Sequence, residues 1–210
     1  LFAMSAREIS DPDFWWHLAT GRYIVQTRSI PRHDVFSYTA TDHKWITHEW
    51  LTQVVMYALY NIGGLTALLL ATCLVISATF ALVYVQCAAR PHLAVFAVLL
   101  GALASAVTWG ARPQMVNMLL AAWFMRLLER YRSGDRRSLW LLPLSTVLWV
   151  NLHSGFFLGL TLVALFIVGE WIAIAFGQKT ERTLPPRRIW LLTGVLLACI
   201  VASLFTTNTY

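Results

Sequence analysis

Long apolar runs separated by short polar turns dominate the chain after residue 64. A membrane-spanning helix needs about 20 apolar residues to cross roughly 30 Å of hydrocarbon at about 1.5 Å per residue. Five runs approach or reach that length. A sixth is shorter and contains Pro143, so we expect it to be thin, kinked or tilted. In chain order the six runs are 65–88, 93–110, 113–130, 139–152 (the short one), 154–176 and 189–206. The pattern predicts an all-α, polytopic bundle of about six transmembrane helices.

Composition agrees with this prediction. Of the 210 residues, 58% are hydrophobic and 12% are charged, whereas about a quarter of the residues in an ordinary soluble domain are charged. The net charge of +6 is interpreted as a signal of membrane orientation, so membrane lipids and no nucleic acid are the expected partners. The three cysteines lie in or beside apolar runs and are interpreted as small core residues. They are Cys73, Cys87 and Cys199.

Basic residues mark one side of the predicted bundle. Arg90 lies in one turn, and the segments "ERYRSGDRR" and "GQKTERTLPPRR" hold four basic residues each. These three turns alternate with turns that hold Arg112 alone. Short cytoplasmic loops concentrate Lys and Arg. The basic turns are therefore predicted to be cytoplasmic, and residues 11–64 extracytoplasmic.

This orientation brings most of the unusual polar residues to the extracytoplasmic side. They are Asp11, Asp13, His17, Asp34, His48, Glu49, Arg112, Gln114, Asn151 and His153. A site assembled from separate turns on one side of a membrane suits a lipid-linked or extracytoplasmic substrate.

Three regions are expected. Residues 1–10 would end a preceding transmembrane helix, 11–64 would form a large extracytoplasmic loop, and 65–210 would form the bundle. The chain starts at Leu1 and stops at "SLFTTNTY", beside an apolar run. We therefore expect it to be a fragment of a longer protein.

The loop itself is predicted to contain two amphipathic helices lying in the membrane interface. Asp11 followed by Pro12 is a good start for the first helix. Thr47 is the expected cap of the second, which would run to Gly63 and Gly64 before the chain enters the membrane.

Two stretches, "DPDFWWHLATGRYI" and "IPRHDVFSYT", resemble the first extracytoplasmic loop of GT-C class membrane glycosyltransferases, in particular oligosaccharyltransferases and protein mannosyltransferases. The pattern is most similar to bacterial members of that class with unassigned reactions, which share DPDxWWHL, IPxxDxFS, HEWL, RPQ and WxNLH. The motifs cover residues 1–64 well, and the rest is similar only in topology. The resemblance implies a protein of the bacterial inner membrane.

The resemblance also implies a reaction. Such enzymes transfer a sugar from a polyprenyl phosphate or diphosphate donor to an acceptor outside the cytoplasm. Inversion at the anomeric carbon needs a base, and Asp13 or Asp11 is the candidate. The leaving phosphate needs a positive charge or hydrogen-bond donors. The candidates for this role are Arg112 first, then His153 and His48.

Other polar residues on the same side are assigned supporting roles. They are His17, Glu49, Asn151 and Asp34. Asp11, Asp13 and His17 are also an option for binding Mg²⁺ or Mn²⁺, since carboxylates suit these cations. The chemistry does not demand a metal, because part of the class works without one.

Each candidate also has a structural interpretation. Asp11 can simply cap a helix, Arg112 can reach lipid headgroups, and Asn151 and His153 can satisfy backbone groups at a helix break. Glu170 is expected at the membrane interface. At the level of function, a transporter of a lipid-linked solute and a non-catalytic scaffold remain alternatives to the transferase. The absence of ionisable residues at mid-membrane depth in the sequence pattern disfavours the transporter.

Overall fold

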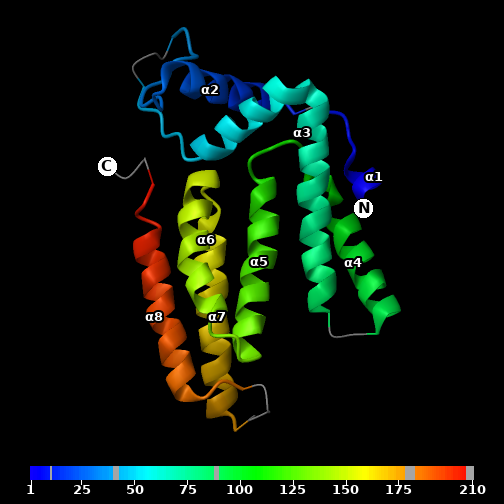
Figure 1. The fold of residues 1–210 in the computed structure, drawn as a ribbon, viewed down its shortest axis with the longest axis vertical. Helices are drawn as coiled ribbons and strands as arrows, with labels where there is room; N and C mark the ends of the chain where they lie inside the picture. The colour runs from blue at the N-terminus through cyan, green and yellow to red at the C-terminus, as the bar shows by residue number, and fades with distance from the viewer. Residues whose placement is uncertain (10, 40–42, 88–89, 178–182, 207–210) are drawn as a thin grey trace.

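The computed structural model describes residues 1–9, 11–39, 43–87, 90–177 and 183–206. Within these residues the protein is all-α, as predicted, with eight α-helices and one 3₁₀ turn (Figure 1). The helices are α1 (Phe2–Ser5), α2 (Asp13–Thr27), α3 (Trp50–Gln86), α4 (Pro91–Ser105), α5 (Met115–Arg132), α6 (Ser138–Leu152), α7 (Phe156–Ala175) and α8 (Pro186–Ala202), and the 3₁₀ turn η1 is Ala106–Thr108. A helix lies at each of the six predicted spans.

Three helices of the described chain are long and apolar enough to cross a membrane. They are α3, the continuous segment Pro91–Thr108 formed by α4 and η1, and α7. The 15-residue α6 and the 17-residue α8 are shorter, and α5 is charged in its last two turns. The lengths and apolar compositions of α3, the α4–η1 segment and α7 indicate a membrane protein.

Helix α3 changes direction at a pair of glycines, where its second half turns down into the bundle (Figure 1). Gly63 has φ −150° and ψ 23°, and Gly64 has φ 61° and ψ −149°. The positive φ of Gly64 lies in a region that a side chain disfavours. The predicted break between two helices at this pair is therefore confirmed.

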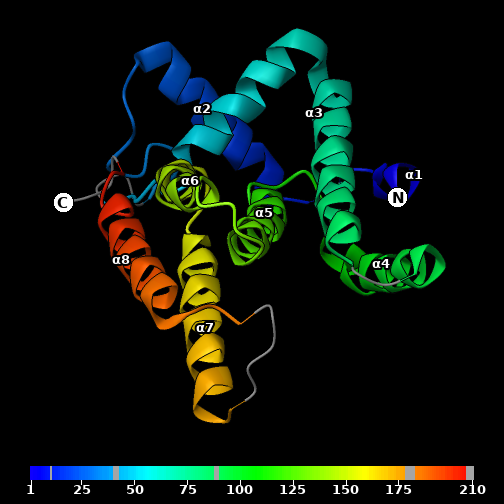
Figure 2. The same cartoon turned by 60° about the horizontal axis from the view of Figure 1, so that its bottom comes forward.

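Helix α2 and the first half of α3 cross one end of the bundle, at the top of Figure 1. The turned view in Figure 2 shows the same crossing, with α4 diverging from α6, α7 and α8. The crossing is close: a Cβ atom on Gly21 would lie 2.0 Å from the carbonyl oxygen of Gln53. Only a glycine allows the two backbones to approach this closely.

Three apolar clusters hold the helices together. The largest joins α5, α6, α7 and α8 and includes Tyr131, Leu142, Trp149 and Ile189, all fully buried. A second lies among α3, α4 and the turn before α5. The third packs α2 on α3. Because α2 shares an apolar cluster with α3, the polar side chains of the crossing are positioned by a packed core.

Glu170 lies near the end of α7, and its side chain is buried against other protein groups, with only 3% exposed. The Nε and Nη2 atoms of Arg132 donate to its Oε1 at 3.0 and 2.5 Å, and the Leu184 amide donates to its Oε2 at 2.8 Å. A carboxylate removed from water needs such partners. Arg132 of α5 and the backbone before α8 provide them, so this carboxylate links three parts of the chain.

Candidate functional site

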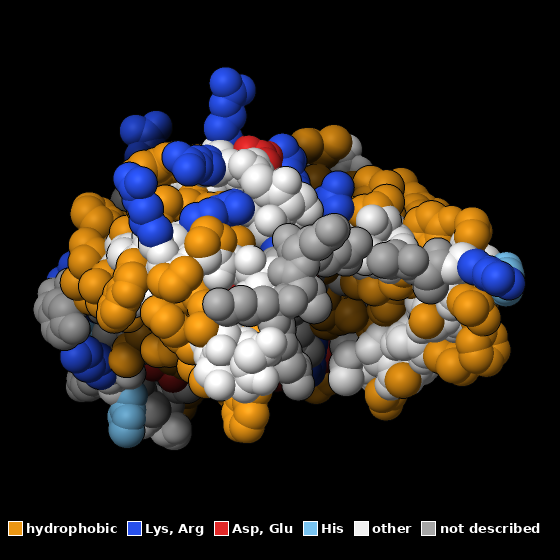
Figure 3. Space-filling view, turned by 90° about the horizontal axis from the view of Figure 1, so that it is seen from below, with side chains coloured by type: hydrophobic (Ala, Val, Ile, Leu, Met, Phe, Trp, Pro, Cys, Tyr) orange, Lys and Arg blue, Asp and Glu red, His pale blue; other side chains and the backbone are white. Residues whose placement is uncertain are grey.

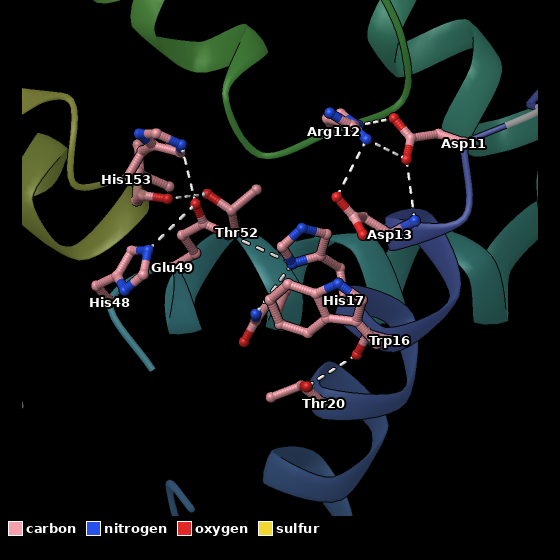
Figure 4. Close-up of polar contacts among 12 residues, drawn as sticks. Asp11, Asp13, Trp16, His17, Thr20, His48, Glu49, Thr52, Arg112 and His153 are labelled. Carbon is pink, nitrogen blue, oxygen red and sulfur yellow. Dashed lines mark hydrogen bonds and ion pairs between the residues drawn. The ribbon is translucent and has the colours of Figure 1, made fainter. Parts of the chain in front are cut away.

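An arginine and two aspartates form the first polar cluster at the α2 end of the structure (Figure 4). The guanidinium of Arg112 contacts both carboxylate oxygens of Asp11 through Nε and Nη2. Its Nη2 also lies 3.1 Å from Oδ2 of Asp13. We call these three residues the Arg112 cluster. Arg112 is brought to the two aspartates from about a hundred residues away in the sequence, so the three residues meet at one end of the molecule.

Two different turns present the members of this cluster. Asp11 precedes α2, and its Oδ1 accepts a hydrogen bond from the Asp13 amide at 2.9 Å. Asp11 thus stabilises the start of α2, as its structural interpretation predicts, and also binds Arg112. Arg112 lies in the turn between η1 and α5, where its carbonyl accepts from the Met115 amide at 3.1 Å. Its guanidinium is held by carboxylates, so the turn orients it toward α2.

The exposed fractions differ within the Arg112 cluster. The side chain of Asp13 is 55% exposed, against 21% for Asp11 and 27% for Arg112. Asp13 has one contact with the guanidinium and Asp11 has two. Asp13 is therefore the carboxylate that is easier to reach and easier to displace.

A buried glutamate surrounded by three histidines forms the second polar cluster, beside the first (Figure 4). Oε1 of Glu49 lies 2.9 Å from Nε2 of His153 and 3.5 Å from Nε2 of His48, and its Oε2 lies 3.3 Å from Nδ1 of His17. We call these four residues the Glu49 cluster. It joins α2, the segment before α3 and the α6–α7 junction around one carboxylate.

The carboxylate of Glu49 is the anion at the centre of this cluster. Burial raises the pKa of Glu49, but hydrogen bonds from His153 and His48 outweigh it and hold the pKa at about 2. The hydrogen bond to Glu49 raises the pKa of His48, whereas burial lowers the pKa of His17 despite the nearby glutamate. Glu49 is therefore a stable anion and a poor proton acceptor.

The orientation of His153 follows from its neighbours. Its Nδ1 accepts from the Gly155 amide at 2.8 Å and lies 2.9 Å from Nδ2 of Asn117. Oδ1 of Asn117 accepts from the Trp149 indole at 2.7 Å, which assigns the amide orientation. Nδ1 of His153 is thus an acceptor, and Nε2 carries the proton that faces Glu49.

Asn117 and Gln53 are site residues that the sequence interpretation missed. Gln53 is buried, and its Nε2 lies 3.1 Å from Nδ1 of His17. The available signal was an amide side chain in an otherwise apolar helix, which needs a partner when buried. Thr47, the expected cap of α3, instead donates to the carbonyl of Pro31 at 3.0 Å, and α3 begins at Trp50.

Asn151 and Asp34 have structural contacts. Oδ1 of Asn151 accepts from the Trp50 indole at 2.9 Å, and its amide donates to the carbonyls of Val147 and Phe205. Asn151 thus ties α6 to the start of α3.

Oδ1 of Asp34 accepts from the backbone amides of Phe36 and Ser37, and hydrogen bonds from Ser37 and Phe36 lower the pKa of Asp34. Asp34 thereby fixes a turn of the loop.

The Arg112 cluster borders two cavities. A cavity of about 420 Å³ lies between the segment before α2 and the turn before α5, and its lining includes Arg7, Asp11, Trp109 and Arg112. A smaller cavity of about 110 Å³, lined mostly by apolar side chains of α3 and α5, also reaches Arg112. Arg112 therefore lies where a polar cavity meets an apolar one.

The residues proposed for a divalent cation do not fit one. The carboxylates of Asp11 and Asp13 face Arg112, and His17 faces Glu49 and Gln53. Across the described ranges, no group of three or more His, Cys, Asp or Glu side chains is arranged to hold a metal ion. The guanidinium of Arg112 provides the positive charge between the two aspartates.

Comparison of the chain with models of known protein families, with curated proteins and with solved structures finds no match. The geometry of the two polar clusters is therefore the basis for any assignment of function.

Proposed function

We propose that this chain is part of an integral membrane glycosyltransferase. It would transfer a sugar from a polyprenyl-phosphate donor to an extracytoplasmic acceptor, with inversion at the anomeric carbon. The observation that carries this proposal is Arg112, held by Asp11 and Asp13 where a polar and an apolar cavity meet. In this proposal all six bundle helices cross the membrane, and residues 11–64 lie outside the cytoplasm.

An amphiphilic phosphate suits this place on the molecule. A polyprenyl phosphate needs an apolar surface for its chain, a cation for its phosphate and polar space for its sugar. The apolar cavity between α3 and α5 supplies the surface for the chain, and the guanidinium of Arg112 supplies the cation. The larger polar cavity supplies the space for the sugar. Arginine binds phosphate oxygens in a bidentate manner, as it binds Asp11 here.

Donor binding would also release the base. Arg112 with two carboxylates has a net charge of −1, so a phosphate must displace one carboxylate to bind. Asp13 is the carboxylate with one contact and the larger exposed fraction, whereas Asp11 is held by Arg112 and by the Asp13 amide. The phosphate therefore replaces Asp13 and leaves its carboxylate free to accept a proton.

The transfer step forms one bond to the anomeric carbon and breaks another. The acceptor oxygen or nitrogen forms a bond to the anomeric carbon while the bond from that carbon to the phosphate oxygen breaks. The departing phosphate keeps the electron pair, and its charge is stabilised by Arg112. The acceptor proton passes to Asp13. The Glu49 cluster holds α2 in place through His17, and the Glu49 carboxylate is too weak a base to take the acceptor proton because its pKa is about 2.

The test compares co-purified lipid by native mass spectrometry of the full-length parent protein. Arg112→Ala should lose bound polyprenyl phosphate, and Asp13→Asn should keep it. Arg22→Ala is the matched control, because Arg22 is an exposed arginine of α2. Retention of polyprenyl phosphate by Arg112→Ala, or only bulk phospholipid in every sample, would contradict the proposal.

The orientation has its own test. Single cysteines at Tyr38, which is 99% exposed, and at Ser133, beyond α5, would be introduced into a cysteine-free protein. An impermeant thiol reagent applied to intact cells should label the first and spare the second. The opposite labelling would show the reverse orientation and would contradict an extracytoplasmic site for the donor.

A further inference from the structure

A large apolar groove runs along the middle of the bundle, from the first turn of α5 at Met118 to the end of α3 at Gln86 and Cys87. It has a volume of about 680 Å³ and is lined by α3, α4, α5 and α7, with Phe80, Met118, Met125 and Leu158 among its walls. Helix α4 diverges from the other helices on this side (Figure 2). The groove is thus bounded by apolar side chains of four helices and needs an apolar occupant.

A polar cavity continues the groove toward the basic end of the molecule. It has a volume of about 470 Å³, and its lining includes Arg126, Glu129, Arg130 and Asp135. The two cavities share Gln86 and Cys87 at the end of α3. Nε2 of Gln86 donates to the carbonyl of Ala122, so this shared edge is fixed to α5.

One face of α5 passes through both cavities. Met118, Ala122 and Met125 line the groove, and Arg126 and Arg130 line the polar cavity. These spacings of three and four residues place the side chains along the same side of a helix. Met118 and Arg126 are separated by eight residues, or about 12 Å of helix. That distance is comparable with the roughly 15 Å depth of one leaflet of hydrocarbon.

Arg126 is left with an uncompensated charge. Asp135 is 2.5 Å from Nη2 of Arg130, and Glu129 is 2.9 Å from Nη1 of Arg132, so the acidic side chains of the polar cavity are already paired. Within the part of the chain that the structure describes, Arg126 has no ion-pair partner. Figure 3 shows Lys and Arg side chains gathered on this end of the molecule. The cavity next to the groove therefore favours an anion.

We infer that this pair of cavities binds an anionic glycerophospholipid from the leaflet beside the arginine-rich end of the bundle. Its phosphate contacts Arg126, and its acyl chains lie in the groove between α4 and α5. The charge selects an anionic headgroup, and the continuous apolar groove selects a lipid over a soluble phosphate. This site is separate from the Arg112 cluster and does not depend on the reaction proposed there.

The test uses native mass spectrometry of the delipidated full-length protein titrated with dioleoylphosphatidylglycerol, dioleoylphosphatidylcholine or glycerol phosphate. The phosphatidylglycerol should bind about tenfold more tightly than the phosphatidylcholine, because both carry a phosphodiester but the choline cation of the latter neutralises its headgroup beside the unpaired charge of Arg126. Glycerol phosphate should not bind at the same concentrations. Arg126→Gln should remove the preference for phosphatidylglycerol, whereas Arg136→Gln, an exposed arginine at the same end, should keep it.

A second variant tests the groove. A Cβ atom on Gly101 would lie 4.0 Å from its nearest neighbour, a ring carbon of Phe80, so Gly101→Leu can fill the groove without a backbone clash. It should weaken binding of both lipids at least several-fold, with the melting temperature used to verify folding. Equal affinity of Arg126→Gln and Arg136→Gln for phosphatidylglycerol would overturn the inference. Unchanged lipid binding by Gly101→Leu, or a dimer that excludes lipid, would overturn it equally.

Discussion

Gly21 is the position where a single methyl group should separate the two surface helices. An added Cβ would lie 2.0 Å from the carbonyl oxygen of Gln53, whereas ordinary contact begins near 3.4 Å. Helix α2 must therefore move away from α3 by about 1.4 Å, or the α3 backbone must yield by the same distance. The 3.1 Å contact between Gln53 and His17 and the 3.3 Å contact between His17 and Glu49 would both be stretched.

The expected cost can be set against a matched control. Overpacking of this kind costs about 1–3 kcal/mol, while replacing a helical glycine by alanine gains up to about 1 kcal/mol from helix propensity. Gly169→Ala in α7 has the same gain and no neighbour within 4 Å of its Cβ. The difference between the two variants therefore isolates the steric term, at about 2 kcal/mol.

Thermal unfolding of the full-length protein in detergent measures this difference. A change of about 2 kcal/mol corresponds to roughly 4–8 °C in Tm for a chain of this size. Gly21→Ala should melt below Gly169→Ala by that amount. Equal melting temperatures would refute the close backbone crossing, and with it the geometry that brings His17 to Glu49.

Three further predictions concern stability. The pKa of Glu49 is depressed from 4.5 to about 2, so its contribution to folding stability is present above pH 4.5 and is lost as the pH falls toward 2. Glu49→Gln should therefore flatten this part of a plot of Tm against pH. Parallel profiles of the variant and the wild type would contradict the depressed pKa. Glu170→Gln should lower the free energy of unfolding by about 1–3 kcal/mol, because Arg132 loses its buried anionic partner, and an unchanged Tm in detergent would show that the pair contributes nothing. Gly64→Ala should cost about 1–3 kcal/mol from its positive φ alone, since nothing lies within 4 Å of its Cβ; a Tm equal to that of Gly194→Ala, a helical glycine with the same open space, would argue against the bend.

The helices could be predicted from local sequence patterns, because the lengths of the apolar runs and the positions of prolines and paired glycines are features of neighbouring residues. The helix at each predicted run and the bend at Gly63 and Gly64 follow from such signals. A second kind of signal, the distribution of basic residues between the turns, predicted a shared side for Arg112, Asp11 and Asp13 but not their contact. That signal gives a shared side, and the structure adds the contacts.

The Glu49 cluster could not be predicted in the same way. His17 and His153 meet Glu49 because α2 crosses α3 above the α6–α7 junction, and that crossing depends on tertiary packing at Gly21. The burial of Glu170 likewise depends on Arg132 from another helix. Contacts between residues far apart in sequence leave no periodic trace in either segment.

The first turn of α3 is joined to the end of α6 by a short series of contacts. Glu49 meets His153, the indole of Trp50 donates to Asn151, and the hydroxyl of Thr52 donates to the carbonyl of Leu152 at 2.7 Å. This half of α3 is thus anchored at its start by polar bonds and at its end by the bend into the bundle. It is therefore held at both ends, and α2 packs on it through apolar contacts and the close approach at Gly21. In hydrogen exchange, the amides of residues 50–62 should therefore be protected for longer than those of α2.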